Sequence, residues 1–199
     1  MINEPSAYAE HTTRLARELT AALVAESDDT TLAGRVAEIA SRLTEAAAAP
    51  QDVTVDDPLV FRTVFGAGRG PVTSARNPIA PPVDVDFDGE QAVGLVTLGL
   101  QYQGPPNRVH GGIVALCFDD VLGAAAHVGG RVPAFTRELT ITYDAATPLD
   151  TPLEFRAWIE SESGRKRFMA GEVRAGGQVT ARARGLWISP REPIEFPVL

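Results

Sequence analysis

The spacing of apolar residues divides the chain into a helical N-terminal part and a strand-rich C-terminal part. Near the N-terminus, leucine, valine and isoleucine recur every three or four positions in two stretches: Leu15, Leu19 and Leu23, then Leu32, Val36, Ile39 and Leu43. This spacing is typical of one face of a helix and predicts two amphipathic helices within residues 5–49. Thr30 or Thr31 is a suitable N-cap for the second helix. Because each apolar stripe is narrow, we expect both helices to pack on the rest of the chain or on a partner subunit.

From residue 83 onward, apolar and polar residues alternate, which predicts β-strands. The predicted elements are strands 83–87 and 91–100, a helix 111–127 closed by Gly129-Gly130, and strands 135–143, 153–160, 166–174 and 178–188. Within 135–143, alternation places Phe135, Leu139, Ile141 and Tyr143 on one face and Thr136 on the other. Short turns between the strands indicate an antiparallel sheet. The helix is apolar on nearly all sides, so we expect an α+β fold in which the sheet wraps around it.

Residues 51–82 are predicted to connect the two parts. This segment is rich in proline and glycine, including Gly66-Ala67-Gly68-Arg69-Gly70. The cluster does not match a nucleotide-binding loop, because Pro71 stands where G-x-G-x-x-G requires glycine and no Lys-Ser/Thr pair follows. We interpret it as a loop, with closure over a substrate as the alternative. The expected organisation is an N-terminal helical extension (1–50), a connector (51–82) and a main domain (83–199).

Charge and cysteine content narrow the possible functions. The net charge is −8, so a basic field for nucleic acid is absent and we expect no nucleic-acid partner. The single cysteine, Cys117, cannot form an internal disulfide or a thiolate metal cluster, and we interpret it as a core residue. We find no signal peptide and no apolar stretch of about 18 residues, so we expect a cytoplasmic protein without a membrane span.

The candidate catalytic residues lie in His110-Gly111-Gly112 and at Asp119, nine positions after the histidine. Glycines at a helix start let a ligand approach the backbone closely, and the first N–H groups of a helix lack partners within it. They can therefore bind a carbonyl oxygen as it gains negative charge. Asp119 and Asp120 lie in an apolar run, where a carboxylate is costly to bury unpaired. Because helix neighbours point about 100° apart, we expect only one of them to serve a given site.

These motifs and the order of the elements resemble the PaaI-type acyl-CoA thioesterases, which have the hotdog fold. The resemblance covers roughly residues 83–189, and its matching segments are 109–115, 118–119, 136–143 and 163–168. It implies an antiparallel sheet of five to six strands wrapped around one long central helix. The two N-terminal helices lie outside this resemblance.

The resemblance also implies roles for individual residues. Asp119 would be the nucleophile or the general base, and the Gly111 N–H would bind the thioester oxygen. His110 would orient the loop, water or thioester, and Thr136 would assist. Sites of this family form between subunits, so we expect a homodimer or homotetramer with shared sites and no metal or redox cofactor. The hairpin tip would hold the phosphates of coenzyme A through Arg165, Lys166 and Arg167, although such a cluster is also typical of a solvated turn.

One position departs from the family. Many members carry asparagine or glutamine six residues before the histidine, where this chain has Gly104. Gln103 and Asn107 are the nearest substitutes for positioning water. A non-catalytic hotdog protein that binds acyl-CoA therefore stays an alternative, as does an interaction protein acting through its N-terminal helices. A hydratase, a serine hydrolase, a cysteine nucleophile and a metal hydrolase each lack their sequence signatures. We expect His127, near the helix end, to be structural and favoured there as a cation by the helix dipole.

Overall fold

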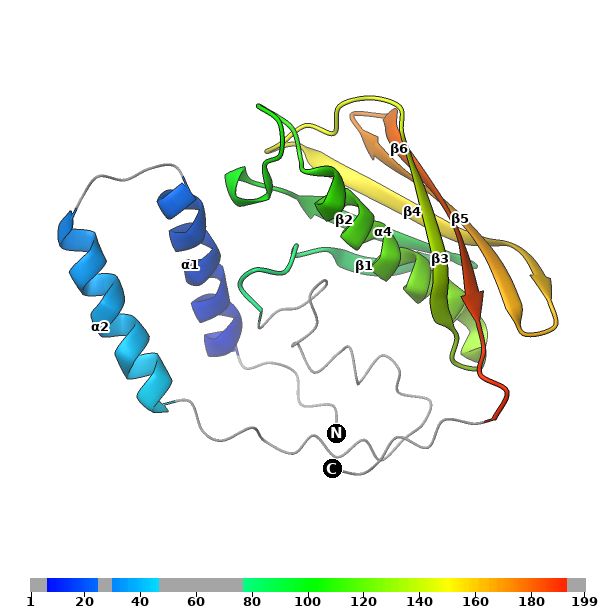
Figure 1. The fold of residues 1–199 in the computed structure, drawn as a ribbon, viewed down its shortest axis with the longest axis horizontal. Helices are drawn as coiled ribbons and strands as arrows, with labels where there is room; N and C mark the ends of the chain where they lie inside the picture. The colour runs from blue at the N-terminus through cyan, green and yellow to red at the C-terminus, as the bar shows by residue number, and fades with distance from the viewer. Residues whose placement is uncertain (1–6, 25–29, 47–76, 193–199) are drawn as a thin grey trace.

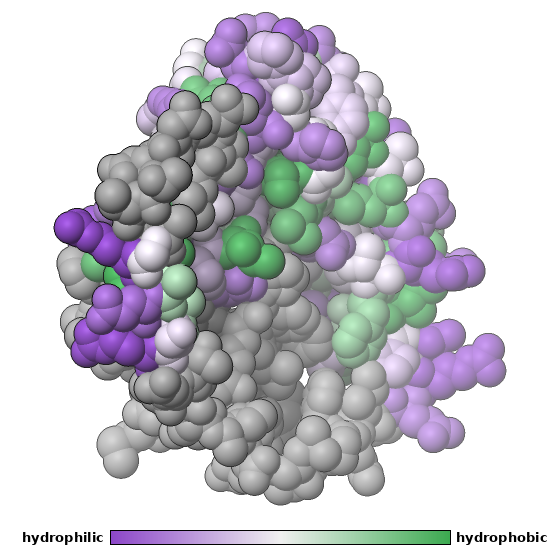
Figure 2. Space-filling model, turned by 60° about the vertical axis from the view of Figure 1, so that its left-hand side comes forward, coloured by the Kyte–Doolittle hydropathy of each residue, from purple (hydrophilic) through white to green (hydrophobic). Residues whose placement is uncertain are grey.

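The computed structural model describes residues 7–24, 30–46 and 77–192. Two helices, α1 (Ala7–Val24) and α2 (Thr30–Ala46), are present where the apolar periodicity predicted them. Most of the predicted connector, 51–82, lies outside the described residues. In Figure 1, α1 lies between α2 and the sheet domain. Apolar patches are visible among polar ones on this side of the molecule (Figure 2), and Leu15 and Ile79 are among the exposed apolar residues.

The helix α1 contacts the main domain beside a short 3-10 helix, η1 (Leu100–Tyr102). Arg17 Nη2 donates a hydrogen bond to the carbonyl of Asn77 at 3.1 Å, linking residues 60 positions apart. Along α2, by contrast, the residues from Gly34 to Arg42 are exposed except for the partly buried Val36. The first helix is therefore joined to the main domain, whereas the described part of α2 is not covered by the rest of the chain.

Six antiparallel strands form one sheet in the order β1-β2-β4-β5-β6-β3. The strands are β1 (Asp84–Asp88), β2 (Gln91–Thr97), β3 (Phe135–Tyr143), β4 (Pro152–Ser163), β5 (Lys166–Ala175) and β6 (Gln178–Ile188). The helix α4 (Gly111–Ala126) lies along one face of the sheet, which curves around it (Figure 1). The predicted fold class is confirmed.

The central helix is held by apolar contacts with the sheet. Its buried residues are Val114, Cys117, Phe118, Val121, Leu122, Ala125 and Ala126. Phe118 meets Phe155 of β4 edge to face, with ring centroids 5.1 Å apart, an arrangement that aromatic pairs favour. A Cβ on Gly94 of β2 would come within 2.8 Å of Val121, so a glycine is needed where the helix lies closest to this strand. Packing of this kind holds the middle of α4 against the sheet.

The edge strand β3 contains a β-bulge that changes which side chains face the helix. Its register against β6 shifts between Thr136 and Glu138. Thr136 therefore faces α4, on the same side as Leu139 and Ile141, which pack against the core. The prediction that Phe135 shares a face with Leu139 was wrong, because an extra residue reverses the alternation across the bulge. Phe135 is 39% exposed.

Candidate active site

His110 forms the N-cap of α4. Its backbone is extended (φ −61°, ψ 133°), and its Nδ1 accepts a hydrogen bond from Gly112 N–H at 2.9 Å. The N–H groups of Ile113 and Val114 both donate to the His110 carbonyl. Because Nδ1 is an acceptor, the neutral ring carries its proton on Nε2. Among the described residues, the Gly111 N–H has no acceptor, as is usual in the first turn of a helix.

A tight loop precedes this helix. Arg108 N–H donates to the Pro105 carbonyl, and Asn107 between them has φ 61°, which fits a type II turn with asparagine at its third position. Gln103 Oε1 accepts from the Asn107 N–H at 3.2 Å. The two predicted water-positioning candidates thus lie together in this loop. The carbonyl of the Gln103 side chain closes the loop, whereas Asn107 is exposed at the turn.

Gly104 packs directly against the candidate site. A Cβ at this position would lie 2.8 Å from His110 Cα and 3.2 Å from His110 Cβ, closer than real Cβ contacts allow. The Gly104 N–H also donates to the Arg108 carbonyl, which fixes the loop beside His110. An asparagine or glutamine, as in the family, does not fit this loop. The departure at Gly104 is thus tied to the shape of the chain around His110.

Asp119 lies on the half-buried side of α4 next to the edge strand. Thr136 Oγ1 donates a hydrogen bond to Asp119 Oδ1 at 2.8 Å. The structure therefore brings together two of the predicted catalytic residues. The neighbouring Asp120 is close enough to Cys117 for its charge to affect the pKa of the thiol. Burial, reinforced by Asp120, raises the pKa of the Cys117 thiol to about 12, as suits a core residue and not a nucleophile.

Gly111 and Asp119 are well separated within one chain. They are eight residues apart on the same helix, and a rise of about 1.5 Å per residue sets them about 12 Å apart along its axis. One copy therefore does not bring the amide and the carboxylate to the same carbonyl carbon.

Tyr143 also contacts the helix start, and no sequence motif marks this contact. This tyrosine ends β3, and its hydroxyl donates to the Gly111 carbonyl at 2.8 Å. A Cβ on Gly111 would lie 3.1 Å from the tyrosine oxygen and 3.2 Å from its Cζ, so ring and glycine are in close contact. The apolar alternation had assigned Tyr143 to the core-facing side, and its side chain does turn toward α4 while 52% of the residue is exposed.

The predicted basic cluster at 165–167 is divided between two faces of β5. Arg165 and Lys166 are exposed, and Arg165 Nη1 donates to the Ser189 carbonyl at 2.5 Å. Arg167 is only 5% exposed. Its guanidinium donates to the carbonyls of Ala126 and Val132 at 2.8 and 2.9 Å. It also pairs with Glu162 at 3.1 Å.

Arg167 is therefore not part of an exposed phosphate-binding cluster, and its predicted role is corrected. Strand alternation was the missed signal, because position 167 shares its parity with the buried Met169 and Val173. The guanidinium instead supplies positive charge at the C-terminus of α4, where a cation is favourable.

His127 was expected to supply that charge, and this expectation is also corrected. Its Nδ1 lies 2.6 Å from the Gly123 carbonyl, and its Nε2 accepts from Ala134 N–H at 3.1 Å. The ring is therefore neutral, with the proton on Nδ1. Burial lowers the pKa of His127, and the nearby Arg167 charge lowers it further. The structural role predicted for His127 is retained in this neutral form.

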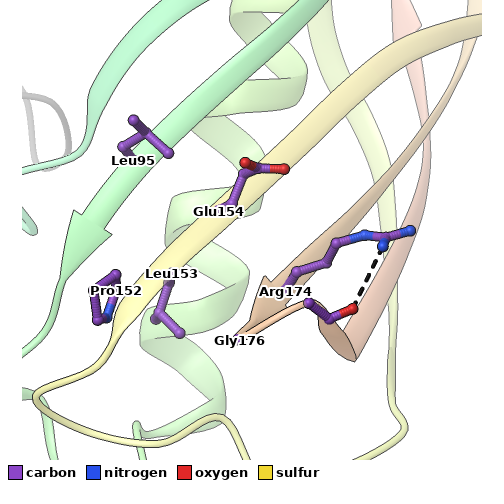
Figure 3. A pocket seen from close by; sticks show the side chains of 7 residues that line it. Leu95, Pro152, Leu153, Glu154, Arg174 and Gly176 are labelled. Atoms are coloured by element: carbon purple, nitrogen blue, oxygen red, sulfur yellow. Dashed lines mark hydrogen bonds between the residues drawn. The ribbon is translucent and has the colours of Figure 1, made fainter.

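A pocket of about 270 Å³ lies on the outer face of the sheet, away from the predicted site (Figure 3). It is lined by Leu95, Pro152, Leu153, Glu154, Arg174, Gly176 and Gly177. Arg174 is held there by Glu172 at 2.7 Å and by the Gly177 carbonyl. None of the predicted site residues contributes to this pocket.

Two features are absent from residues 7–24, 30–46 and 77–192. No group of three or more histidine, cysteine, aspartate or glutamate side chains is arranged to hold a metal ion in this part of the chain. Across the same residues, no helix is both long enough and apolar enough to span a membrane.

Comparison with known proteins places the chain in a family. Residues 107–182 match the family model described as thioesterase superfamily. A crystal structure described as a thioesterase superfamily protein is 33% identical with a TM-score of 0.79, covering 93% of this chain and 92% of that one. The E. coli PaaI protein is 19% identical with a TM-score of 0.51 over 54% of this chain and 82% of its own, and shows the shared fold alone.

Curated relatives match a shorter part of the chain. Acyl-coenzyme A thioesterase THEM4 of Mus musculus is 30% identical over 53% of this chain, and that of Bos taurus is 32% identical over 51%. The matches span 46% and 42% of those relatives, less than half of their length. The family that the motifs predicted is confirmed: this chain belongs to the thioesterase superfamily and has its hotdog fold.

Proposed function

We propose that this protein hydrolyses acyl-CoA thioesters to the free acid and coenzyme A. The observation that carries the proposal is the Asp119 carboxylate, which lies in an otherwise apolar helix and is held by Thr136 at 2.8 Å. Burying part of a carboxylate in such a helix costs free energy unless the group has a hydrogen-bond partner. A carboxylate kept at this position and held by a hydroxyl suggests a role in the reaction. The curated relatives are named acyl-coenzyme A thioesterases, which supports this substrate class.

The reaction needs a polarised carbonyl and an attacking oxygen. The Gly111 N–H, at the positive end of α4, would donate to the thioester oxygen as it becomes an oxyanion. Asp119 would attack the carbonyl carbon to form an anhydride that water cleaves, or would take a proton from the attacking water. In both routes the C–S bond breaks, the sulfur leaves as coenzyme A thiolate and takes up a proton, and water supplies the new acid oxygen.

Two copies of the chain would complete one site. Within the part of the chain that the structure describes, β3 lies at the edge of the sheet and pairs with β6, so its other edge can pair with a second strand. If two β3 strands pair antiparallel about a twofold axis, the start of each lies beside the end of the other. Asp119, bound to Thr136 at the start of one strand, would then approach Gly111, bound to Tyr143 at the end of the other. The two groups that lie about 12 Å apart along one helix would then meet across the interface, each supplied by a different copy.

Substrate binding is proposed for the exposed members of the basic hairpin. Arg165 and Lys166 would hold coenzyme A phosphates, and Asn107 would orient water from the loop before His110. Replacing Lys166 with alanine is expected to raise KM for acyl-CoA several-fold. KM for a matched thioester that lacks the phosphates is expected to stay unchanged. An equal rise for both substrates would contradict phosphate binding.

The central experiment measures thiol release from short, aromatic and long-chain acyl-CoA esters. Asp119→Asn is expected to lower kcat by about 10²-fold or more, since it removes the base or nucleophile. It keeps an oxygen to accept from Thr136. A wild-type protein that turns over none of these esters, or an Asp119→Asn variant with full activity, would refute the proposal. Binding of acyl-CoA without turnover would favour the ligand-binding alternative.

The oxyanion donor can be tested with a matched pair of variants. Proline is well tolerated at the first position of a helix and lacks an N–H, so Gly111→Pro removes the proposed donor. The extended backbone of His110 suits a following proline. Gly111→Ala adds the same Cβ but keeps the N–H, so it controls for contact with Tyr143. We expect Gly111→Pro to lower kcat by roughly 10²-fold relative to Gly111→Ala.

Mixing inactive variants tests whether sites are shared between copies. Asp119→Asn and Gly111→Pro subunits, dissociated and reassociated in equal amounts, should form half of their dimers as mixed pairs. Each mixed pair would contain one intact site of two, so activity should recover to about a quarter of wild type. Mixtures that stay as inactive as either variant alone would place each site within a single chain.

A further inference from the structure

The two glycines at the start of α4 require something to hold them. Glycine loses more conformational freedom on folding than other residues, and the ends of helices fray. An oxyanion donor works only if it is fixed where the charge develops. His110 restrains this turn from one side, because its ring accepts the Gly112 N–H. The side of the turn that faces the edge strand is restrained by Tyr143.

The Tyr143 hydrogen bond is not needed to satisfy the Gly111 carbonyl. In an α-helix this oxygen already accepts from the N–H four residues later, and the phenol occupies its second lone pair. The bond therefore adds restraint on the orientation of the glycine peptides. The ring lies against the Gly111 Cα, and even a Cβ there would be only 3.1 Å from the hydroxyl oxygen. The phenol and the proposed donor residue thus fit each other closely.

We propose that Tyr143 is a positioning residue for thioester hydrolysis, with its hydroxyl holding the first turn of α4 so that the Gly111 N–H stays aimed at the thioester oxygen. This inference rests on the function proposed above. It assigns Tyr143 no contact with the substrate. It also gives the edge strand two separate tasks, because Thr136 near its start orients Asp119 while Tyr143 at its end orients Gly111.

Tyr143→Phe tests the proposal, because it removes the hydroxyl and keeps the ring. We expect kcat to fall about five- to tenfold, which corresponds to the net free energy of one hydrogen bond. KM should change less than about twofold. Thr140→Val is the matched control, since it removes a hydroxyl from an exposed residue of the same strand. The control should keep wild-type kcat. A Tyr143→Phe enzyme with wild-type kcat would overturn the proposal.

A second measurement separates positioning from general packing. In the Gly111→Pro background, which has no N–H to aim, Tyr143→Phe should cause no further loss of kcat. If it slows Gly111→Pro by the same factor as wild type, the hydroxyl acts in another way and the proposal fails.

Amide hydrogen exchange makes the test independent of turnover. Tyr143→Phe should speed exchange of the Gly112 amide, which is hydrogen-bonded to His110, about fivefold and leave the amides near Ala126 unchanged. Unchanged exchange at Gly112 would overturn the positioning role. A wild-type protein inactive on all acyl-CoA esters would refute the proposed function, while the exchange result would still decide whether Tyr143 holds Gly111.

Discussion

Thr136 Oγ1 donates to Asp119 Oδ1 at 2.8 Å, and the bulge after Thr136 makes this contact possible. Without the extra residue, Thr136 would point to the outer face of the sheet, as simple alternation predicts. The hydrogen bond occupies one carboxylate oxygen, and in the proposed reaction Oδ2 would face the substrate or water. A side chain on the edge strand thereby fixes the orientation of a carboxylate on the central helix.

Thr136→Val is therefore expected to lower kcat about five- to tenfold, because the carboxylate loses its orienting donor. Thr136→Ser keeps a hydroxyl and should retain most of the activity. Initial rates of thiol release at saturating acyl-CoA measure both effects. Thr142→Val, at an exposed position of the same strand, serves as the control. Equal activity of the valine and serine variants at position 136 would show that the hydroxyl does not contribute.

Gly104→Ala should disturb the loop that precedes α4, because the added Cβ would lie 2.8 Å from His110 Cα. We expect a loss of about 1–3 kcal/mol in the free energy of unfolding, as for other overpacked sites, together with a lower kcat. Urea unfolding and thiol release measure the two quantities. Gly34→Ala is the control, because nothing lies within 4 Å of its added Cβ. A Gly104→Ala protein with wild-type stability and activity would show that the loop can relax.

Most of the fold could be predicted from the sequence because it follows from local patterns. Period-two alternation and glycine turns indicated the six strands, and the uniformly apolar run indicated a covered central helix. The exceptions are places where one residue breaks the local rule. The bulge beside Thr136 reverses a strand face, and the last turn of α4 is capped by Arg167 from a strand 41 positions away.

Only those residues of the candidate site that belong to a recognisable motif could be predicted from the sequence. Asp119 and His110 were identified by their separation and Thr136 by the family resemblance, and the structure adds the hydrogen bonds from Thr136 to Asp119 and from Gly112 to His110. The contact of Tyr143 with Gly111 joins residues 32 positions apart, and no local pattern marks it. Arg167 was assigned to a binding site because three cations are adjacent, although strand alternation turns the third of them inward.

Arg167 is expected to act on stability and not on substrate affinity. Arg167→Met would leave two backbone carbonyls without their donor and Glu162 with only its longer pair to Arg131, at a cost of about 3 kcal/mol. Lys166→Met, at the exposed neighbour, should change stability by less than about 0.5 kcal/mol. Urea unfolding gives both values. If Arg167→Met raised KM for acyl-CoA without loss of stability, the buried assignment would be wrong.

Arg17 tests whether α1 belongs to the catalytic unit. It bonds the Asn77 carbonyl, and α1 lies beside η1, whose Tyr102 carbonyl accepts the His110 N–H at 2.9 Å. Arg17→Ala should cost about 1 kcal/mol of stability and lower kcat. Arg14→Ala, which loses an exposed pair with Glu18, should change neither. Unchanged turnover of Arg17→Ala would instead favour an interaction role for the N-terminal helices.

His127 should make stability depend on pH below neutrality. Its pKa is lowered in the folded protein, first by burial and then by Arg167, and these outweigh the opposing effect of the Gly123 carbonyl, while the Ala134 N–H binds the neutral form of the ring. The unfolded chain, with a histidine pKa of about 6.5, therefore binds the proton more readily than the folded one. The contribution of His127 is fully present above about pH 6.5 and is lost as the pH falls through the folded pKa. His127→Gln cannot titrate, so the stability difference between wild type and variant should shrink as the pH is lowered from about 8 to about 5. Urea unfolding at several pH values measures this difference, and a constant difference over that range would mean that His127 is not held neutral by the fold.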